Sequence, residues 1–186
     1  MQALDALKNR ISHGKLIAPG PSSEQRAEIE AAALRAADHG NLRPWRYLYI
    51  SGEGLQALGE LYLKAALADK TELDEQQKER LLKMPLRAPC LYVAIANIVE
   101  HPKVPREEQL MAVAASVQNM ITAAFALGVG AYWRSGDMAF HQVVKDGLGM
   151  QATEEIVGFV YMGTPQIPNR SVPELQVPDF FQNWPN

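Results

Sequence analysis

An uncharged run from Leu110 to Val129 constrains the fold of this chain more than any other feature of the sequence. A run of that length can span a bilayer as a helix. However, it is rich in alanine and carries Ser116, Gln118, Asn119 and Thr122, whereas membrane helices are usually richer in Leu, Ile and Phe. We therefore interpret the run as a helix buried all round, inside a core or at a subunit interface, and we expect no membrane partner.

Length and charge narrow the class of protein further. The 186 residues fit a single domain, 1–186, with one core, and the net charge is −3. A nucleic-acid surface needs a basic patch, so we expect no nucleic-acid partner, and any bound phosphate would need arginines placed close to it. The N-terminus carries Asp5 and lacks the apolar core of a signal peptide, so we expect a cytoplasmic protein.

The residues that most often form metal or redox centres are sparse. A single cysteine, Cys90, excludes a disulfide or a cysteine zinc site within one chain. It lies in PCLYVAIAN, which is typical of a buried strand, so we interpret it as a core residue rather than a nucleophile. His13, His39, His101 and His141 have no metal-ligand spacing, and we expect no metal site.

The order of apolar and polar segments predicts an α+β fold. Ser22 and Gln25 have the spacing of a capping box at a helix start, and Gly128 is a natural end for the long helix that begins near Pro105. We expect further helices over 2–10, 23–39, 53–68, 72–84 and 140–148, and strands over 45–50, 91–97, 131–134 and 156–162. Prolines after Gly163 preclude long helices in the tail.

Common nucleotide and hydrolase motifs do not occur. The segment LGVGA contains a GxG, but it lacks the third glycine and leads from a helix into a strand. A dinucleotide fingerprint needs a strand, then a loop, then a helix, so we exclude a Rossmann loop. GxSxG, HExxH and the P-loop pattern are also missing from the sequence.

Two polar segments near the N-terminus are candidate binding sites. In NRISHGK, Arg10 and Ser12 place a guanidinium and a hydroxyl in one loop, and arginine is suited to bidentate phosphate contacts. In LRAADHGNLRPW, Arg35 and His39 are four residues apart, so we expect them on one face of a helix. Each segment alone also fits an ordinary solvated helix end and surface turn.

The third candidate is GAYWRSGD, which follows the uncharged run. Trp133 and Arg134 precede Ser135 and Gly136, where main-chain N–H groups could be exposed. The alternative is a strand end whose tryptophan packs into the core. Together the three segments supply arginines, hydroxyls, an aromatic ring and loop amides, which suit a phosphorylated, planar cofactor. FMN is such a molecule, but these residue types alone do not distinguish it from a nucleotide.

Several motifs, in matching order over nearly the whole chain, resemble the nitroreductase family of flavoproteins, in its short YdjA-like branch. They are ALDALKNRIS, LRAADHGNLRPWRY, HPKVPREEQ, GAYWRSG and EIVGFVYMGTPQ. The resemblance implies a central, mainly antiparallel sheet flanked by helices, with the long buried helix at the interface of a homodimer. It implies an FMN-dependent oxidoreductase that takes electrons from NADH or NADPH and reduces a small-molecule acceptor, such as a nitroaromatic or a quinone.

The resemblance also assigns roles to residues. Arg10, Ile11 and Ser12 would hold the FMN phosphate and ribityl chain, and Arg35 and His39 would reach the flavin from the partner chain. The isoalloxazine would lie beside Trp133, Arg134 and Ser135. The chemistry would occur at flavin N5, and no protein residue is named as catalytic.

In similar proteins, nicotinamide binding is sometimes ascribed to the end of the long helix. In this chain the corresponding residues are Ala123, Ala124, Phe125, Ala126, Leu127 and Gly128. Our interpretation from the residues themselves is that this segment is mostly core. The sequence departs from the wider family at Arg43, where a glutamine is usual, and at Lys15, where a second arginine is usual. Arg170 is a further candidate for the phosphate site.

Two other functions remain open at this stage. One is a flavin-binding or flavin-consuming protein of the same fold without nitroreductase turnover. The other is a non-enzymatic protein whose uncharged helix serves only to form a dimer. A yellow purified protein would exclude the non-enzymatic dimerisation protein, because both the oxidoreductase and the flavin-binding alternative would contain flavin.

Overall fold

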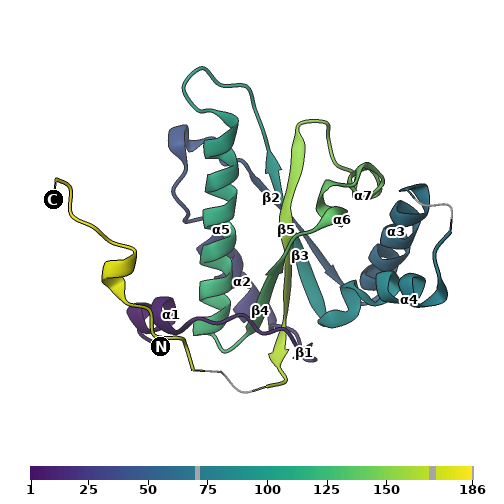
Figure 1. The fold of residues 1–186 in the computed structure, drawn as a ribbon, viewed down its shortest axis with the longest axis horizontal. Helices are drawn as coiled ribbons and strands as arrows, with labels where there is room; N and C mark the ends of the chain where they lie inside the picture. Colours follow the sequence, from purple (N-terminus) through teal and green to yellow (C-terminus); the bar gives the residue numbers. More distant parts are fainter. Residues whose placement is uncertain (70–71, 168–170, 186) are drawn as a thin grey trace.

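The structure is a computed structural model that describes residues 1–69, 72–167 and 171–185. Within these residues, five strands form one antiparallel sheet (Figure 1). The order is β1 (Leu16–Ile17), β5 (Glu154–Pro165), β3 (Cys90–Asn97) and β2 (Trp45–Ser51), and β4 (Gly130–Arg134) also pairs with β5. The predicted α+β class is confirmed, although the two-residue strand β1 was not predicted.

Strand β3 is the centre of the sheet because β2 and β5 flank it and both of its faces are covered. Side chains of a strand alternate between the two faces. Leu91 and Val93 therefore belong to one core cluster, and Cys90 and Tyr92 to the other. Cys90 is 1% exposed, as predicted, and burial raises the pKa of its thiol, which keeps it protonated near neutral pH.

One face of the sheet is covered by α2 (Ser23–Ala33) and α5 (Arg106–Ala126), and α1 (Ala3–Asn9) packs near the end of α5 (Figure 1). The capping box of Ser22 and Gln25 is present, and α5 ends before Gly128, whose φ is 77°. By length and composition α5 could cross a membrane, but half of its apolar window is buried inside the fold. The outward face, which includes Ala115, is exposed in the single chain, so burial all round would require the subunit interface that the expectation also allowed.

The other face is covered by α3, α4, α6 and α7. Tyr62 on α3 is 1% exposed, and its ring meets that of Phe159 on β5 edge to face at 5.7 Å. This packing joins α3 to the sheet beside the end of β4. The bounds of the four helices are Glu53–Asp69, Glu75–Lys83, Asp137–Phe140 and Gln142–Gly147.

Two helix predictions were wrong in their bounds. The helix predicted over 23–39 ends at Ala33, because two side chains of α5 bind its last carbonyls: Ser116 Oγ donates to Ala33 O at 2.6 Å and Asn119 Nδ2 to Ala32 O at 3.3 Å. The helix predicted over 140–148 is interrupted at His141, whose Nδ1 accepts the N–H of Val143 at 3.1 Å and so caps α7.

Candidate functional site

The loop after α1 lies against the start of β4. Arg10 ends the helix, and its Nη1 donates to Ser12 Oγ at 3.4 Å. The backbone N–H of His13 then donates to the carbonyl of Ala131 at 3.0 Å. Two of the three predicted segments are therefore adjacent in one chain, with Arg10 and Ile11 half-buried and Ser12 exposed.

The side chains of β4 divide between the two faces of the sheet. Trp133 packs against the cluster under α2 and α5, and its indole N–H donates to the Val157 carbonyl at 3.3 Å. A side chain at Gly158 would collide with this indole, so the glycine lets the ring lie across β5. Arg134 lies on the opposite face, with its guanidinium 3.9 Å from the centre of the Tyr132 ring.

A planar ligand could therefore reach both Trp133 and Arg134 only along the main chain of β4. Beyond Ala131, whose carbonyl already accepts the N–H of His13, this edge is accessible, because among the described strands β4 pairs with β5 alone. Ser135 and Gly136 extend the edge and are exposed. Gly136 has a φ of 117°, a conformation that other residues rarely adopt, so its main chain can be held in this turn at little cost.

The residues present fit an FMN. No carboxylate pairs with Arg10 within the described part of the chain, so its guanidinium is available to a phosphate beside the Ser12 hydroxyl. The open edge of β4 offers main-chain groups to a flat ring. Lys15 is exposed in the same loop and its carbonyl accepts the N–H of Gln166 at 3.1 Å. Arg170, the further phosphate candidate, lies outside the described residues.

The second segment lies elsewhere. Because α2 ends at Ala33, Arg35 and His39 do not share a helix face, and that prediction was wrong. Arg35 lines a hollow of about 350 Å³ together with Asn41 and Arg43. His39 Nδ1 is 2.5 Å from Glu108 Oε2, in the first turn of α5.

The length of α5 separates the two halves of the predicted cofactor site. The His39 segment contacts the first turn of this helix, whereas the Arg10 loop contacts β4, which follows its last turn (Figure 1). At 1.5 Å per residue, Glu108 and Ala126 lie about 27 Å apart. One mononucleotide cannot contact Arg10 and His39 of the same chain across that span.

The predicted nicotinamide segment lies at the end of α5. Ala124 is fully buried in the core cluster under α5 and Phe125 is 8% exposed, while Leu127 and Gly128 are exposed. Ala123 and Ala126 are intermediate in exposure. The Leu127 carbonyl accepts the side-chain amide of Gln25 at 3.1 Å. The assignment of this segment to nicotinamide binding stays a prediction.

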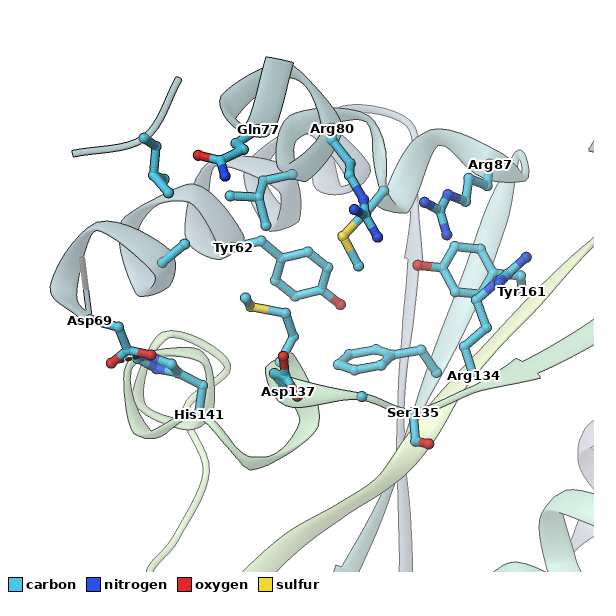
Figure 2. Close-up of a pocket in the computed structure, with 17 residues that line it drawn as sticks. Tyr62, Asp69, Gln77, Arg80, Arg87, Arg134, Ser135, Asp137, His141 and Tyr161 are labelled. Atoms are coloured by element: carbon cyan, nitrogen blue, oxygen red, sulfur yellow. Dashed lines mark ion pairs between the residues drawn. The ribbon is translucent and has the colours of Figure 1, made fainter. Parts of the chain in front are cut away.

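A cavity of about 430 Å³ adjoins the end of β4 on the face covered by α3 and α4 (Figure 2). Arg134 and Ser135 line it, as predicted residues of the flavin site, but so do Tyr62, Arg80 and Arg87, to which sequence reasoning gave no role. These three come from α3, α4 and the short helix η2 (Pro85–Arg87), each inside an ordinary helical pattern. The sequence therefore carries no local signal that would have grouped them.

Burial shapes the chemistry of the tyrosines in this cavity. Burial raises the pKa of Tyr62 well above its usual value, so its hydroxyl remains protonated and can donate. Burial also raises the pKa of Tyr161, and the guanidinium groups of Arg87 and Arg134 act in the opposite direction. The cavity thus presents hydrogen-bond donors and positive charge beside the open edge of β4.

Comparison with known proteins finds relatives that match nearly the whole chain. Residues 7–164 match the Nitroreductase family. The chain is 37% identical over 179 residues, 96% of each sequence, to the Escherichia coli K12 protein named "Putative NAD(P)H nitroreductase YdjA".

Solved structures agree on the fold. A nitroreductase-like family protein from Bacillus cereus superposes with a TM-score of 0.84 at 22% identity, covering 100% of this chain and 97% of that one. A mutant of the FMN and NADPH-dependent nitroreductase NfnB from Sphigopyxis sp. strain HMH superposes with a TM-score of 0.79 at 15% identity, covering 100% of both chains. At these identities the likeness establishes the fold alone.

Proposed function

The chain belongs to the nitroreductase family, and from that premise we propose that it is an FMN-dependent oxidoreductase. NADH or NADPH would be the electron donor, and a small molecule such as a nitroaromatic or a quinone would be the acceptor. The observation that carries the proposal is the placement of Arg10, with which no carboxylate pairs within the described residues, and its neighbour Ser12 beside the open edge of β4. FMN and NADPH both appear in the name of a structural relative with the same fold.

Each residue of the site would act by binding or orienting the cofactor. Arg10 and Ser12 would hold the phosphate through charge-assisted hydrogen bonds. Trp133 anchors β4 to β5 through its bond to Val157, so the strand edge that would contact the ring is rigid. Bound FMN would supply the hydride and electron transfer, and we assign no protein side chain as a catalytic acid or base.

We also propose that the protein is a homodimer whose two FMN sites are each built from both chains. The separation of Arg10 from His39 along α5 supports this arrangement, because the two residues can meet at one flavin only if they come from different chains. In a symmetric dimer the same surface is used twice, so two equivalent sites would form. Arg35 and His39 would then approach the flavin from the partner.

One side of the molecule exposes the apolar surface that such a dimer would bury. The outward face of α5 carries Met111, Ala115 and Gln118 and is uncharged from Leu110 onward. The side chains of Leu4 and Leu7 on α1 are 69% and 61% exposed. An apolar surface of this extent is typical of an interaction site.

The C-terminal tail extends away from the body of the fold on that same side (Figure 1). Its large apolar side chains are exposed, and Trp184 is 94% exposed. The others are Val172, Leu175, Val177, Phe180 and Phe181. A partner chain would bury these side chains, which favours the dimer over the isolated chain.

The visible spectrum of the purified protein tests the proposed function. We expect flavin absorption bands that bleach with NADH or NADPH under anaerobic conditions and return when a nitroaromatic or quinone is added, with FMN intact over many cycles. A protein that binds FMN but does not complete these cycles would instead be a flavin-holding or flavin-consuming member of the fold. A colourless protein that does not bind added FMN would refute the proposal.

A further inference from the structure

We propose that the cavity beside the end of β4 binds the anionic group of a small aromatic carboxylate, through Arg87, Arg134 and the hydroxyl of Tyr62. Such a molecule would be an electron acceptor, so its role as a substrate rests on the proposed function, whereas its binding does not. The remaining wall of the cavity would hold the aromatic ring.

Positive charge gathers at one end of this cavity. Figure 2 shows Arg87, Arg134 and Tyr161 close together at that end, with Arg80 nearer the middle of the view. The charged groups at the opposite end already have a partner, because His141 Nε2 lies 3.2 Å from Asp69 Oδ1. Two further groups, Asp137 and Gln77, also line the cavity, but within the described residues no ion pair joins a carboxylate to any of the three arginines.

Two buried donors in the cavity have no partner within the described residues. Tyr62 is 1% exposed, and its hydroxyl, which points into the cavity in Figure 2, makes no hydrogen bond. The buried Nε of Arg134 also makes none. A buried donor without an acceptor costs free energy, so such groups are usually satisfied in the working protein. A carboxylate is an acceptor only, with two oxygens that could take both donors.

The rest of the cavity suits a flat apolar body. The rings of Tyr62 and Phe159 and the side chains of Met84 and Leu81 line it. Its volume of about 430 Å³ lies in the range of small-molecule sites. Ser135 and Gly136 also line it, so a bound ring would extend toward the edge of β4 where we place the flavin.

The phosphate of FMN is the competing occupant of an arginine-rich cavity. Arg10 and Ser12, which we propose hold the phosphate, do not line this cavity. The hydrogen-bond donors of this cavity also lie beside an apolar wall, which would contact an aromatic ring but has no use for a phosphate. We therefore favour the aromatic carboxylate, and the experiment below separates the two.

Calorimetric titration of the oxidised, FMN-saturated protein tests the proposal without any need for turnover. The probes are 4-nitrobenzoate and its neutral analogue 4-nitrobenzamide, at constant ionic strength. We expect the carboxylate to bind about tenfold or more tightly than the amide, a difference of about 1.4 kcal/mol. Equal affinities for the two probes would overturn the proposal.

Variants then locate the site. Arg87→Gln and Tyr62→Phe should each weaken 4-nitrobenzoate binding about fivefold or more, and Arg87→Gln should leave the binding of the amide unaffected. Lys83→Gln is the matched control, because it removes a charge from the end of α4 without altering the cavity lining. Tyr62→Phe keeps the packed ring, and circular dichroism confirms its fold before titration. An equal loss of 4-nitrobenzoate affinity in Lys83→Gln would refute the assignment.

The two proposals fail in distinguishable ways. If the parent protein prefers the carboxylate but does not oxidise NADH or NADPH with any acceptor, the cavity assignment stands and the proposed function falls. If turnover is normal but the protein does not prefer the carboxylate to the amide, the proposed function stands and the cavity assignment falls. If Arg87→Gln releases FMN while 4-nitrobenzoate binding is unchanged, the cavity holds the cofactor and the inference is wrong.

Discussion

Breaking the ion pair of Arg46 and Glu154 should destabilise the fold strongly. Arg46 Nε donates to Glu154 Oε1 at 2.6 Å and Nη2 to Oε2 at 2.7 Å, and the N–H of Gln151 also donates to this carboxylate at 2.9 Å. The Glu154 side chain is 4% exposed, whereas that of Arg46 is 37% exposed. In Arg46→Met the buried carboxylate keeps only the Gln151 donor.

The magnitude follows from the burial. Removing one partner of a fully buried pair costs about 3–5 kcal/mol. Because water reaches Arg46, we expect about 2–3 kcal/mol, or roughly 5–10 °C in Tm for a domain of this size. Arg106→Met is the matched control, since Arg106 forms the same two-bond pair with the neighbouring Glu155, but at 50% and 32% side-chain exposure. A surface pair of that kind is worth about 0–1 kcal/mol.

The effect of Arg46→Met should also depend on pH. The hydrogen bonds from Arg46 hold the pKa of Glu154 below the ordinary value of a glutamate, against the effect of burial. A lowered pKa stabilises the fold above the unfolded pKa, and this stability is lost as the pH falls through the folded pKa. Without Arg46, burial should raise the pKa, so protonation relieves the unpaired charge. The destabilisation should therefore be larger at pH 7 than near pH 4.

Thermal and urea unfolding measure the loss in free energy of unfolding and its dependence on pH. The protein is saturated with FMN and held at a fixed concentration, because ligand and partner binding also shift apparent stability. The reasoning would be refuted by a loss below about 1 kcal/mol. It would also be refuted if Arg46→Met lost no more free energy of unfolding than Arg106→Met, or if its loss were the same at pH 7 and near pH 4.

Three further predictions concern the cofactor and the dimer. Arg10→Ala should weaken FMN binding about tenfold or more, because a hydrogen bond to a charged group is worth about 1.5–3 kcal/mol. Titration should show no such loss in Lys8→Ala, and unchanged FMN affinity in Arg10→Ala would sink the phosphate assignment. Trp133→Ala should shift flavin fluorescence and slow flavin reduction in stopped flow; if both match the parent, Trp133 only packs the core. Ala115→Glu should give a folded monomer that releases FMN, whereas Ala57→Glu on the exposed surface of α3 should remain a yellow dimer in sedimentation.

The sequence predicted those parts of the fold that local patterns determine. The apolar run around Cys90 predicted β3, the spacing of Ser22 and Gln25 predicted the start of α2, and Gly128 predicted the end of α5. Each of these depends on residues close together in the chain. The resemblance of five ordered motifs then indicated the family, which the comparisons confirm.

Features set by distant residues were not predictable in this way. The end of α2 is fixed by Ser116 and Asn119, more than eighty residues further along, so the sequence alone suggested a longer helix that placed Arg35 and His39 on one face. The cavity at the end of β4 combines residues of α3, α4, η2 and β4, and only the packed fold brings them together. The roles of the predicted flavin residues stay predictions.

The shared-site dimer is tested most directly by mixing two defective variants. Arg10→Ala and Arg35→Ala chains are purified separately, stripped of FMN, mixed in equal amounts under conditions that exchange subunits, and titrated with FMN at the flavin absorbance. If each site takes Arg10 from one chain and Arg35 from the other, every hybrid dimer regains one intact site. Random exchange should then restore tight binding at about a quarter of all sites. If each site lay within one chain, every site would remain defective, and a mixture with no tight binding would contradict the shared site.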